Sequence, residues 1–584
     1  MSKPQKQRIP PHARELFEQY IVTGDHVASD YLTLIKKLVA NKNSEGERWE
    51  EPIKLAYDLL AQEIRENRNS PAETIKFGTS GWRGRLGKDV FAHSVCCVTA
   101  AIVELFQAVD REKEFIPFLG VSSFSEALKR GCVVGFDNRF GGEYLAGCVM
   151  HILAGAGFTI YYAGESTTGV LSAAVLECDA AFSINLTPSH NPLEYGGYKF
   201  NGADAGPAAP LLTERITENS SRIILKDDSA FYRNGDEIHA QIDLDTVTCI
   251  DSLGLWKKMV QRNSTVHGLD LKKCVTRFLQ KKDVAVAVDC VHGASRLHIR
   301  ELFENTSKES LTVLREDSDV TFGGVAPEPS SANMRGVFNL LREKKELFRL
   351  GCIIDPDGDR IRFTDGNFEI SMNQFGAMAF HFLHEYKGKK GIVAKTVATS
   401  NFANRIADIL GEEVFEPAVG FKNFKSVIGK ALVCFEESDG ITIIGHTPEK
   451  DAYIGLFLAL EMMLTTGKNL GEYLQDLEQE YGSYFPARDG IAVSVQGEEL
   501  LNLLKGLEKY SVGSSVSVGS RTRQIVDVIT IDGRKMIFDD GSWLMIRPSG
   551  TEPKVRFYVE SRTDSGTSDL VQTAGKMLEE IGLL

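Results

Sequence analysis

The feature that most constrains the fold is a unit that occurs three times along the chain. Each unit contains an apolar strand, a short loop, an apolar-periodic helix and a second strand within roughly thirty residues, which is typical of a parallel crossover. The units span 132–162, 284–314 and 391–416. Their helices are expected near 141–156, 296–304 and 401–410. The sequence therefore predicts three similar mixed α/β domains, with ligands beyond the carboxyl ends of the strands.

The two ends of the chain do not follow this pattern. Residues 1–70 carry apolar positions at three- and four-residue spacing, which predicts a helical N-terminal extension. From about residue 486, short alternating strands and a terminal helix predict a separate α+β domain. We therefore expect the extension at 1–70 and four domains at 71–245, 246–365, 366–485 and 486–584.

Composition excludes several classes of protein. The net charge of -14 argues against nucleic-acid binding, because affinity for a phosphate backbone needs a basic face. The ten cysteines include no Cys-x-x-Cys pair, so neither a zinc site nor a disulfide framework is indicated. The polar N-terminus and the lack of any run near ~18 apolar residues predict a cytoplasmic protein without a membrane span. A monomer and a homodimer are both compatible with the sequence.

One candidate nucleophile stands in a stiff turn. In Thr187-Pro188-Ser189-His190-Asn191-Pro192, the two prolines remove backbone donors and keep a helix from forming. We therefore expect Ser189 on a rigid, exposed turn that follows a strand. The alternative for these six residues alone is an ordinary surface turn.

A cluster of carboxylates follows the apolar strand 350–354. In an extended loop alternate residues point the same way, which would aim Asp355, Asp357 and Asp359 at one point. Three oxygen ligands, with room for water and a phosphate oxygen, suit Mg²⁺. The alternative is a solvated acidic turn.

Two further segments suit anions. The loop that follows the strand 543–546 offers an arginine, two hydroxyls and a glycine amide, which together suit a phosphate group. These groups belong to Arg547, Ser549, Gly550 and Thr551. In the glycine-rich segment 76–85, backbone N–H groups and Arg83 would approach an anion closely. The alternatives are a Pro-Gly turn and a glycine-rich hairpin with a solvated arginine.

A fourth loop combines carboxylates and a hydroxyl without the spacing of a metal site. It spans 434–440, after the strand 431–433. Glu436 and Ser438 suit hydrogen bonding to vicinal hydroxyls such as those of a sugar.

Together these loops resemble those of the α-D-phosphohexomutase superfamily, and specifically of its phosphoglucomutase members, over about residues 70–584. The family's phosphoserine loop, Thr-x-Ser-His-Asn-Pro, matches residues 187–192, and its metal loop, Asp-x-Asp-Gly-Asp-Arg, matches residues 355–360. Its sugar loop, Gly-Glu-x-Ser, matches residues 436–438, and its phosphate loop, Arg-Pro-Ser-Gly-Thr-Glu, matches residues 547–552. The resemblance implies four domains around one central cleft. It also implies one Mg²⁺ per chain, held by Ser189, Asp355, Asp357 and Asp359.

The resemblance extends to single residues. Arg83 matches the arginine of a Gly-Thr-Ser-Gly-x-Arg-Gly loop, and Lys199 matches a lysine proposed to transfer protons in the family. Lys450 belongs to a match with the Lys-Asp-Gly that follows the sugar loop. Further substrate contacts are implied for Arg360, Gly420 and Lys422, the last two in a loop that helps to tell two substrate orientations apart.

Three positions depart from the family pattern. Phe435 and Ala452 replace usual glycines, and both leave details of the sugar pocket open. Gly440 stands where mannose-accepting members carry a histidine, which makes a mannose phosphate a poorer candidate substrate.

The function implied by the resemblance is that of a phosphoglucomutase, an intramolecular phosphotransferase that acts on a small-molecule sugar phosphate. Phosphorylated Ser189 would convert glucose 1-phosphate into glucose 6-phosphate through glucose 1,6-bisphosphate. Lys199 or Lys450 would be the general acid or base, and His190 either shares that role or orients the loop. The alternatives are a mutase for another sugar phosphate, mannose or a pentose, and a catalytically silent phosphoprotein scaffold of the same fold.

Overall fold

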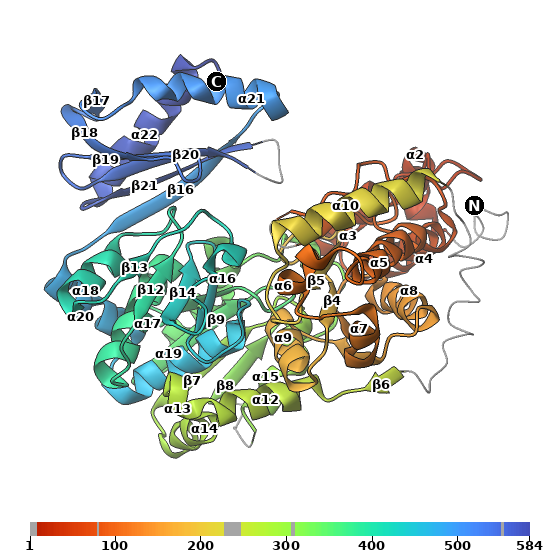
Figure 1. Ribbon diagram of the computed structural model, residues 1–584, viewed down its shortest axis with the longest axis horizontal. Coiled ribbons are helices and arrows are strands. Elements are labelled where there is room, and N and C mark those ends of the chain that lie inside the picture. Colours follow the sequence, from red (N-terminus) through yellow and green to blue (C-terminus); the bar gives the residue numbers. More distant parts are fainter. Residues whose placement is uncertain (1–8, 79–80, 227–246, 305–309, 550–553) are drawn as a thin grey trace.

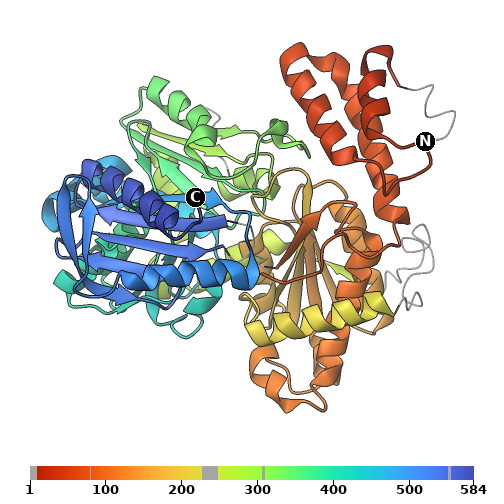
Figure 2. The same cartoon turned by 90° about the horizontal axis from the view of Figure 1, so that it is seen from above.

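The computed structural model consists of a helical extension followed by four α/β units. Figure 1 shows the N-terminal helices in red beside the first unit, with the C-terminal unit in blue at the other end of the molecule, and Figure 2 shows the same arrangement from above. The residues described are 9–78, 81–226, 247–304, 310–549 and 554–584.

The helical extension packs on two of the units. It comprises α2 (Arg14–Tyr20), α3 (Tyr31–Glu45) and α4 (Glu50–Glu66). The Lys36 ammonium lies 2.5 Å from a carboxylate oxygen of Glu194 in the first unit. The Asn43 amide donates to the carbonyl oxygen of Gly323 in the second unit, at 2.9 Å. The extension therefore bridges the first two units.

The first unit contains a six-stranded sheet in the order β1-β5-β4-β2-β3-β6. Its elements are β1 (Trp82–Arg85), α5 (Ala92–Ala108), α6 (Ile116–Leu119), α7 (Phe124–Arg130), β2 (Cys132–Phe136), α8 (Gly142–Gly155), β3 (Ile160–Glu165), α9 (Thr168–Glu177), β4 (Phe182–Leu186), β5 (Tyr195–Asn201), α10 (Pro210–Leu225) and β6 (Val247–Cys249). The predicted boundary after residue 245 is too early, because β6 pairs in parallel with β3.

The second unit contains a five-stranded sheet in the order β11-β10-β9-β7-β8. Its elements are α12 (Ser252–Arg262), α13 (Ser264–His267), α14 (Leu271–Gln280), β7 (Val284–Asp289), α15 (Ile299–Leu302), β8 (Leu311–Leu314), α16 (Ser331–Glu343), β9 (Phe348–Ile354), β10 (Ile361–Thr364) and β11 (Glu369–Ile370). The helix expected at 296–304 was wrong in extent, since a 3₁₀ turn at Ala294–Leu297 precedes a four-residue helix.

The third unit contains a four-stranded sheet in the order β13-β12-β14-β15. Its elements are α17 (Met372–His381), a π-helical turn (Phe382–Tyr386), β12 (Ile392–Lys395), α18 (Phe402–Leu410), β13 (Val414–Phe415), the 3₁₀ turn η9 (Phe421–Phe424), β14 (Ala431–Glu436), β15 (Gly440–Ile443), α19 (Ala452–Thr466) and α20 (Leu470–Tyr481).

The fourth unit contains an antiparallel sheet in the order β16-β21-β20-β19-β18-β17, as expected for a separate α+β domain. Its elements are β16 (Phe485–Ala492), α21 (Gly497–Leu504), β17 (Ser515–Val518), β18 (Arg521–Ile529), β19 (Arg534–Phe538), β20 (Trp543–Pro548), β21 (Lys554–Ser561) and α22 (Asp564–Glu580).

The first three units share one strand topology. In each, the first parallel strand (β2, β7 or β12) lies between a second (β3, β8 or β13) and a third (β4, β9 or β14). The third strand then turns back antiparallel into a fourth (β5, β10 or β15). The central strands are largely apolar because helices cover both faces of the sheet. The prediction of three similar parallel-crossover domains is therefore confirmed.

The connections between the third and fourth strands are the loops of chemical interest. We call them the return loops, and they span 187–194, 355–360 and 437–439. All three lie at the carboxyl edge of their parallel sheets.

No single helix among the described residues is long and apolar enough to cross a membrane. Taken together, α5 and the helical segment 113–130 are long and apolar enough, but the two are bent by 105° relative to each other.

Candidate functional site

The first two return loops meet across the boundary between their units. The hydroxyl of Ser189 donates a hydrogen bond of 2.8 Å to Oδ2 of Asp355. Ser189 is fully buried, so the predicted exposure of this turn was wrong. The prolines do stop the chain from forming a helix, but the second unit packs directly over the turn. The structure thus brings the candidate nucleophile to the candidate metal loop.

The Ser189 loop is held in an unusual backbone conformation. Ser189 has a φ of 58°, a left-handed value that costs a non-glycine residue about 1–3 kcal/mol. Its N–H donates to Oγ1 of Thr187 at 2.8 Å, and that hydroxyl donates to Asp137 at 2.6 Å. The Arg139 guanidinium donates to the carbonyl oxygens of Ser189, Asn191 and Pro192. These contacts fix the turn that the prolines predicted.

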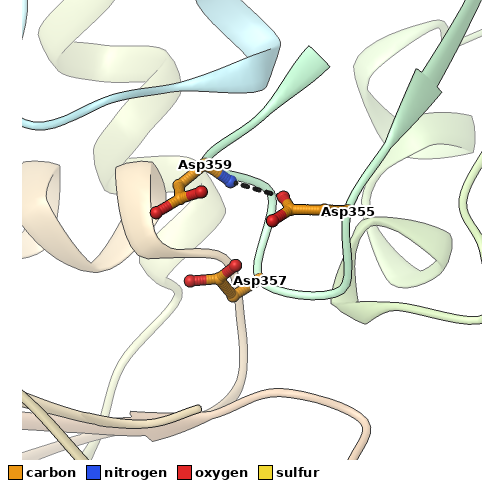
Figure 3. Close-up of side chains that lie close together, drawn as sticks. All are labelled: Asp355, Asp357 and Asp359. Atoms are coloured by element: carbon orange, nitrogen blue, oxygen red, sulfur yellow. Dashed lines mark hydrogen bonds between the residues drawn. The ribbon is translucent and has the colours of Figure 1, made fainter. Parts of the chain in front are cut away.

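The metal loop gathers three buried carboxylates. Asp355, Asp357 and Asp359 each offer an oxygen atom, and these atoms lie within 4.8 Å of one another (Figure 3). The loop is a tight turn and is not extended as expected, since the Gly358 N–H donates to the carbonyl oxygen of Asp355 at 2.9 Å. Gly358 permits this turn because its φ is 63°.

The chemistry of these carboxylates fits a hard cation. Burial, together with Asp357 and Asp359, raises the pKa of Asp355 well above its usual range. One oxygen of Asp357 and one of Asp359 are buried without a hydrogen-bond partner. Buried acceptors of this kind are costly unless something positive faces them. An all-oxygen set with two unused oxygens therefore fits Mg²⁺.

Two lysines already neutralise part of this charge. The Lys199 ammonium, from β5, lies 2.5 Å from Asp357 and 2.7 Å from Asp359. The Lys450 ammonium lies 3.1 Å from Asp359. Burial alone would lower the pKa of Lys199, but Asp357, Asp359 and Glu449 raise it above its ordinary value. The aspartates therefore favour the charged form of Lys199, which has protons to donate.

A histidine lies beside the Ser189 hydroxyl, and two arginines act on that histidine. Nδ1 of His190 lies 3.3 Å from the hydroxyl oxygen. Burial and the guanidinium groups of Arg360 and Arg83 hold the pKa of His190 well below its usual range. Burial and the Arg360 charge also lower the pKa of Arg83. Buried like charges repel each other, so an anion placed between these arginines would be stabilised.

The third return loop begins at a buried carboxylate. Glu436 is the last residue of β14, and its Oε1 accepts a hydrogen bond of 2.9 Å from the Gly420 N–H. Burial raises the pKa of Glu436 to about 7. Ser438 and Lys422 are both half-buried, the first in the loop and the second in η9. The predicted sugar-loop and orientation-loop segments are therefore adjacent.

The structure shows what surrounds each of the three departures from the family pattern. A side chain at Gly376 of α17 would place its Cβ 2.2 Å from the Phe435 ring, so that ring packs against the helix. A Cβ at Gly440 would lie 2.2 Å from Cδ of Lys450, whose side chain fills the space. The Ala452 N–H donates to the carbonyl oxygen of Gly358 at 3.0 Å, which ties α19 to the metal loop.

The phosphate loop of the fourth unit is described in part. Nε of Arg547 donates to Oδ1 of Asp532 at 3.0 Å. The Ser549 N–H donates to the carbonyl oxygen of Lys554 at 2.8 Å, which closes the base of the loop. Gly550 and Thr551, which were predicted to bind phosphate, lie outside the described residues.

Sequence reasoning missed how the return loops are supported. The loop after the first strand of each unit was expected near the site, and in each unit it braces the return loop. In the first unit Asp137 and Arg139 do so, as described above. In the second, the Ala294 N–H donates to the carbonyl oxygen of Pro356 at 2.8 Å. In the third, Thr399 Oγ1 accepts from the N–H of Glu437 at 3.3 Å. The sequence did contain a signal for this supporting role, because each of these loops occupies the same position, directly after the first strand of its unit.

We expect Arg139→Ala to lower the free energy of unfolding by about 3–5 kcal/mol, because three carbonyl oxygens of the Ser189 loop lose their donor and the Asp137 carboxyl, whose pKa burial raises to about 7, loses the cation 3.6 Å away. Urea unfolding followed by fluorescence would measure this change. The exposed Arg335 of α16 offers a control, and Arg335→Ala should shift stability by no more than about 0.5 kcal/mol. Equal effects of the two substitutions would contradict the bracing role.

Four family models match consecutive parts of the chain. They describe the phosphoglucomutase/phosphomannomutase α/β/α domains I, II and III and the C-terminal domain, and they match residues 74–226, 269–368, 371–481 and 497–574. Their limits fall within the four units seen in the structure.

Individual relatives cover nearly the same extent. Phosphoglucomutase 1 of Drosophila melanogaster is 26% identical over 540 residues, which cover 84% of this chain and 91% of that protein. A phosphoglucomutase/phosphomannomutase of Thermococcus kodakarensis is 24% identical over 517 residues, with 86% and 98% covered. The open form of pp63/parafusin, a phosphoglucomutase from Paramecium, has the same fold, with a TM-score of 0.67 at 20% identity and coverage of 88% and 96%. The chain therefore belongs to the phosphoglucomutase/phosphomannomutase family and is a mutase of the isomerase class.

Proposed function

We propose that the protein interconverts glucose 1-phosphate and glucose 6-phosphate by way of a phosphorylated Ser189 and glucose 1,6-bisphosphate. The observation that carries this proposal is the buried hydroxyl of Ser189, which lies 2.8 Å from one of three clustered aspartates and 3.3 Å from His190, a side chain whose pKa Arg360 and Arg83 lower. A phosphoryl group on this hydroxyl would contact cationic groups on one side and the metal loop on the other.

The residues of the site divide the chemistry among them. Asp355, Asp357 and Asp359 would hold Mg²⁺, which, when bound, neutralises charge on the phosphoryl group. Lys199 contacts two aspartates of the metal loop that Ser189 also contacts, and those aspartates raise its pKa, so it would donate the proton that the leaving Ser189 oxygen needs. His190 stays neutral and orients the Ser189 hydroxyl.

The sugar and the second phosphate would be bound by the third and fourth units. Glu436 and Ser438 would accept and donate hydrogen bonds to sugar hydroxyls, beside Gly420 and Lys422. Arg547 would bind the phosphate that does not react, with Ser549, Gly550 and Thr551. The sugar phosphate would turn round between the two half-reactions, so that each end in turn faces Ser189.

Glucose is the proposed sugar because Gly440 stands where mannose-accepting members carry a histidine, and the Lys450 side chain fills the space at this position. A larger residue there would displace Lys450 from Asp359. The alternatives are a mutase for a mannose or pentose phosphate and, less favoured, a phosphoprotein scaffold.

All ten cysteines are free thiols, which supports a reducing, cytoplasmic location.

Peptide mapping and a comparison of substrates would test the proposal. After incubation with glucose 1,6-bisphosphate, we expect one phosphoryl group, located on Ser189. Conversion of glucose, mannose and ribose 1-phosphates should depend on Mg²⁺ and be fastest for glucose. A protein that never carries phosphate on Ser189 would refute the mechanism, and a preference for mannose or ribose would refute the choice of sugar.

The acid limb of the pH profile should report Glu436. Since burial raises the pKa of this carboxyl to about 7, the ionised form that accepts hydrogen bonds from hydroxyls is lost as the pH falls below 7. We expect kcat/KM to fall about tenfold per pH unit on that side. Glu436→Gln should lower kcat/KM and flatten this limb. A limb unchanged in Glu436→Gln would assign it to the substrate phosphate, whose pKa is about 6.

A further inference from the structure

A carboxylate in the fourth unit contacts two parts of the proposed substrate site at once. Asp532 lies in the turn between β18 and β19. Its Oδ1 accepts a hydrogen bond of 3.0 Å from Nε of Arg547, within its own unit. Its Oδ2 accepts one of 3.0 Å from the N–H of Val419, in the third unit.

The turn that carries Asp532 is pressed against the strand that carries Arg547. At the next residue, Gly533, the φ is 75°, and a Cβ would lie 2.3 Å from the carbonyl oxygen of Ile546 and 2.6 Å from Cβ of Arg547. Only glycine fits this close approach, so the distance between the Asp532 backbone and Arg547 is fixed by packing.

The Val419 end of the contact leads directly to the proposed sugar loop. The next amide along the chain, that of Gly420, donates to Oε1 of Glu436 at 2.9 Å. Two consecutive N–H groups are thus bound by two carboxylates from different units. A continuous series of hydrogen bonds therefore runs from Glu436 through the 419–420 peptide and Asp532 to Arg547.

The surrounding interface supports this connection. Val397 and Ala398 of the third unit pack with Trp543, Met545 and Tyr558 of the fourth. The buried Lys535 ammonium donates to the carbonyl oxygen of Val397 at 2.8 Å and to Glu416 at 3.0 Å. The two units are held together elsewhere, so Asp532 is not needed to dock them and its specific effect falls on Arg547.

We propose that Asp532 is a positioning residue that fixes the Arg547 guanidinium relative to the Gly420 and Glu436 segment. This inference rests on the proposed function, in which Arg547 binds the non-reacting phosphate and Glu436 binds the sugar. In this proposal Asp532 itself contacts neither the sugar nor the phosphate. By holding Arg547 in one rotamer with a charge-assisted hydrogen bond, it sets the span between the two ends of the substrate.

Steady-state kinetics of two Asp532 variants would test the proposal. For Asp532→Ala we expect KM for glucose 1-phosphate to rise about tenfold while kcat stays within about threefold, because a charge-assisted hydrogen bond that orders a binding group is lost. Asp532→Asn keeps an acceptor for the Val419 N–H but turns an amide N–H₂ toward Arg547. We expect its KM to be raised almost as much, which assigns the effect to Arg547.

Two controls separate positioning from general damage. Asp527, exposed on β18 of the same unit, provides the matched variant Asp527→Ala, for which KM should be unchanged. In an Arg547→Ala background, Asp532→Ala should raise KM no further, because its target is gone. An unchanged KM in Asp532→Ala, or full additivity with Arg547→Ala, would overturn the inference. A wild-type protein without mutase activity would instead refute the proposed function.

Discussion

Ser189→Ala is expected to lower mutase turnover by at least about 10⁴-fold, the scale on which enzymes lose activity when a covalent nucleophile is removed. The hydroxyl at this position contacts the metal loop at Asp355 and lies beside His190, and alanine offers no atom to carry the phosphoryl group. Turnover of glucose 1-phosphate in the presence of glucose 1,6-bisphosphate would measure the loss. Intact mass should show that this variant takes up no phosphoryl group.

The matched control is Ser221→Ala, on α10 of the same unit, where the hydroxyl bonds only to the carbonyl oxygen of Thr217. Ser221→Ala should unfold at nearly the same temperature as the wild type, whereas Ser189→Ala should lower the free energy of unfolding by about 1–3 kcal/mol, because it leaves a buried oxygen of Asp355 without its donor. Retention of more than a hundredth of wild-type turnover in Ser189→Ala would mean that the reaction proceeds without this phosphoserine.

Asp357→Asn is expected to lower turnover by about 10³-fold, equivalent to ~4 kcal/mol of transition-state stabilisation. Asparagine keeps the shape of the side chain but removes the charge from a buried oxygen that has no hydrogen-bond partner. The Mg²⁺ concentration needed for half-maximal activity should rise in parallel. Titration of activity with Mg²⁺ after treatment with a chelator would measure both quantities.

Asp317 offers a control in the same unit, because its side chain is exposed. Asp317→Asn should leave both turnover and the Mg²⁺ requirement at wild-type values. If Asp357→Asn changed neither, the three aspartates would be a structural cluster neutralised by Lys199 and Lys450 alone.

Much of the fold could be predicted from the sequence because the parallel strands are short and largely apolar. The run at 284–288, which opens the second repeated unit, alternates valine and alanine, a pattern that suits a strand covered on both faces, and the structure places β7 there. The helix expected at 296–304 was overestimated, because its apolar spacing also suits a 3₁₀ turn and a single helical turn. Such short elements depend on tertiary contacts, which local periodicity does not encode.

The sequence predicted which loops form the candidate site, but not how those loops lie relative to one another. The residues of the metal loop were found from their spacing, whereas the burial of Ser189 depends on contact with Asp355, 166 positions further along the chain. The protonated state of Lys199 likewise depends on two aspartates of another unit. The bracing role of Arg139 was not predicted because its hydrogen-bond acceptors in the Ser189 loop are carbonyl oxygens, which leave no mark in the pattern of side chains.

Each return loop begins and ends in neighbouring strands of a single sheet, so its two ends have no freedom to separate. The loop therefore moves as a rigid body with its own domain, and there is little scope for local rearrangement within it. Any opening or closing of the molecule must change the separations between loops while preserving the geometry inside each. Since whole-domain displacements take microseconds to milliseconds, the assembly of the four loops around a substrate would proceed on that timescale, much more slowly than the motion of any single side chain.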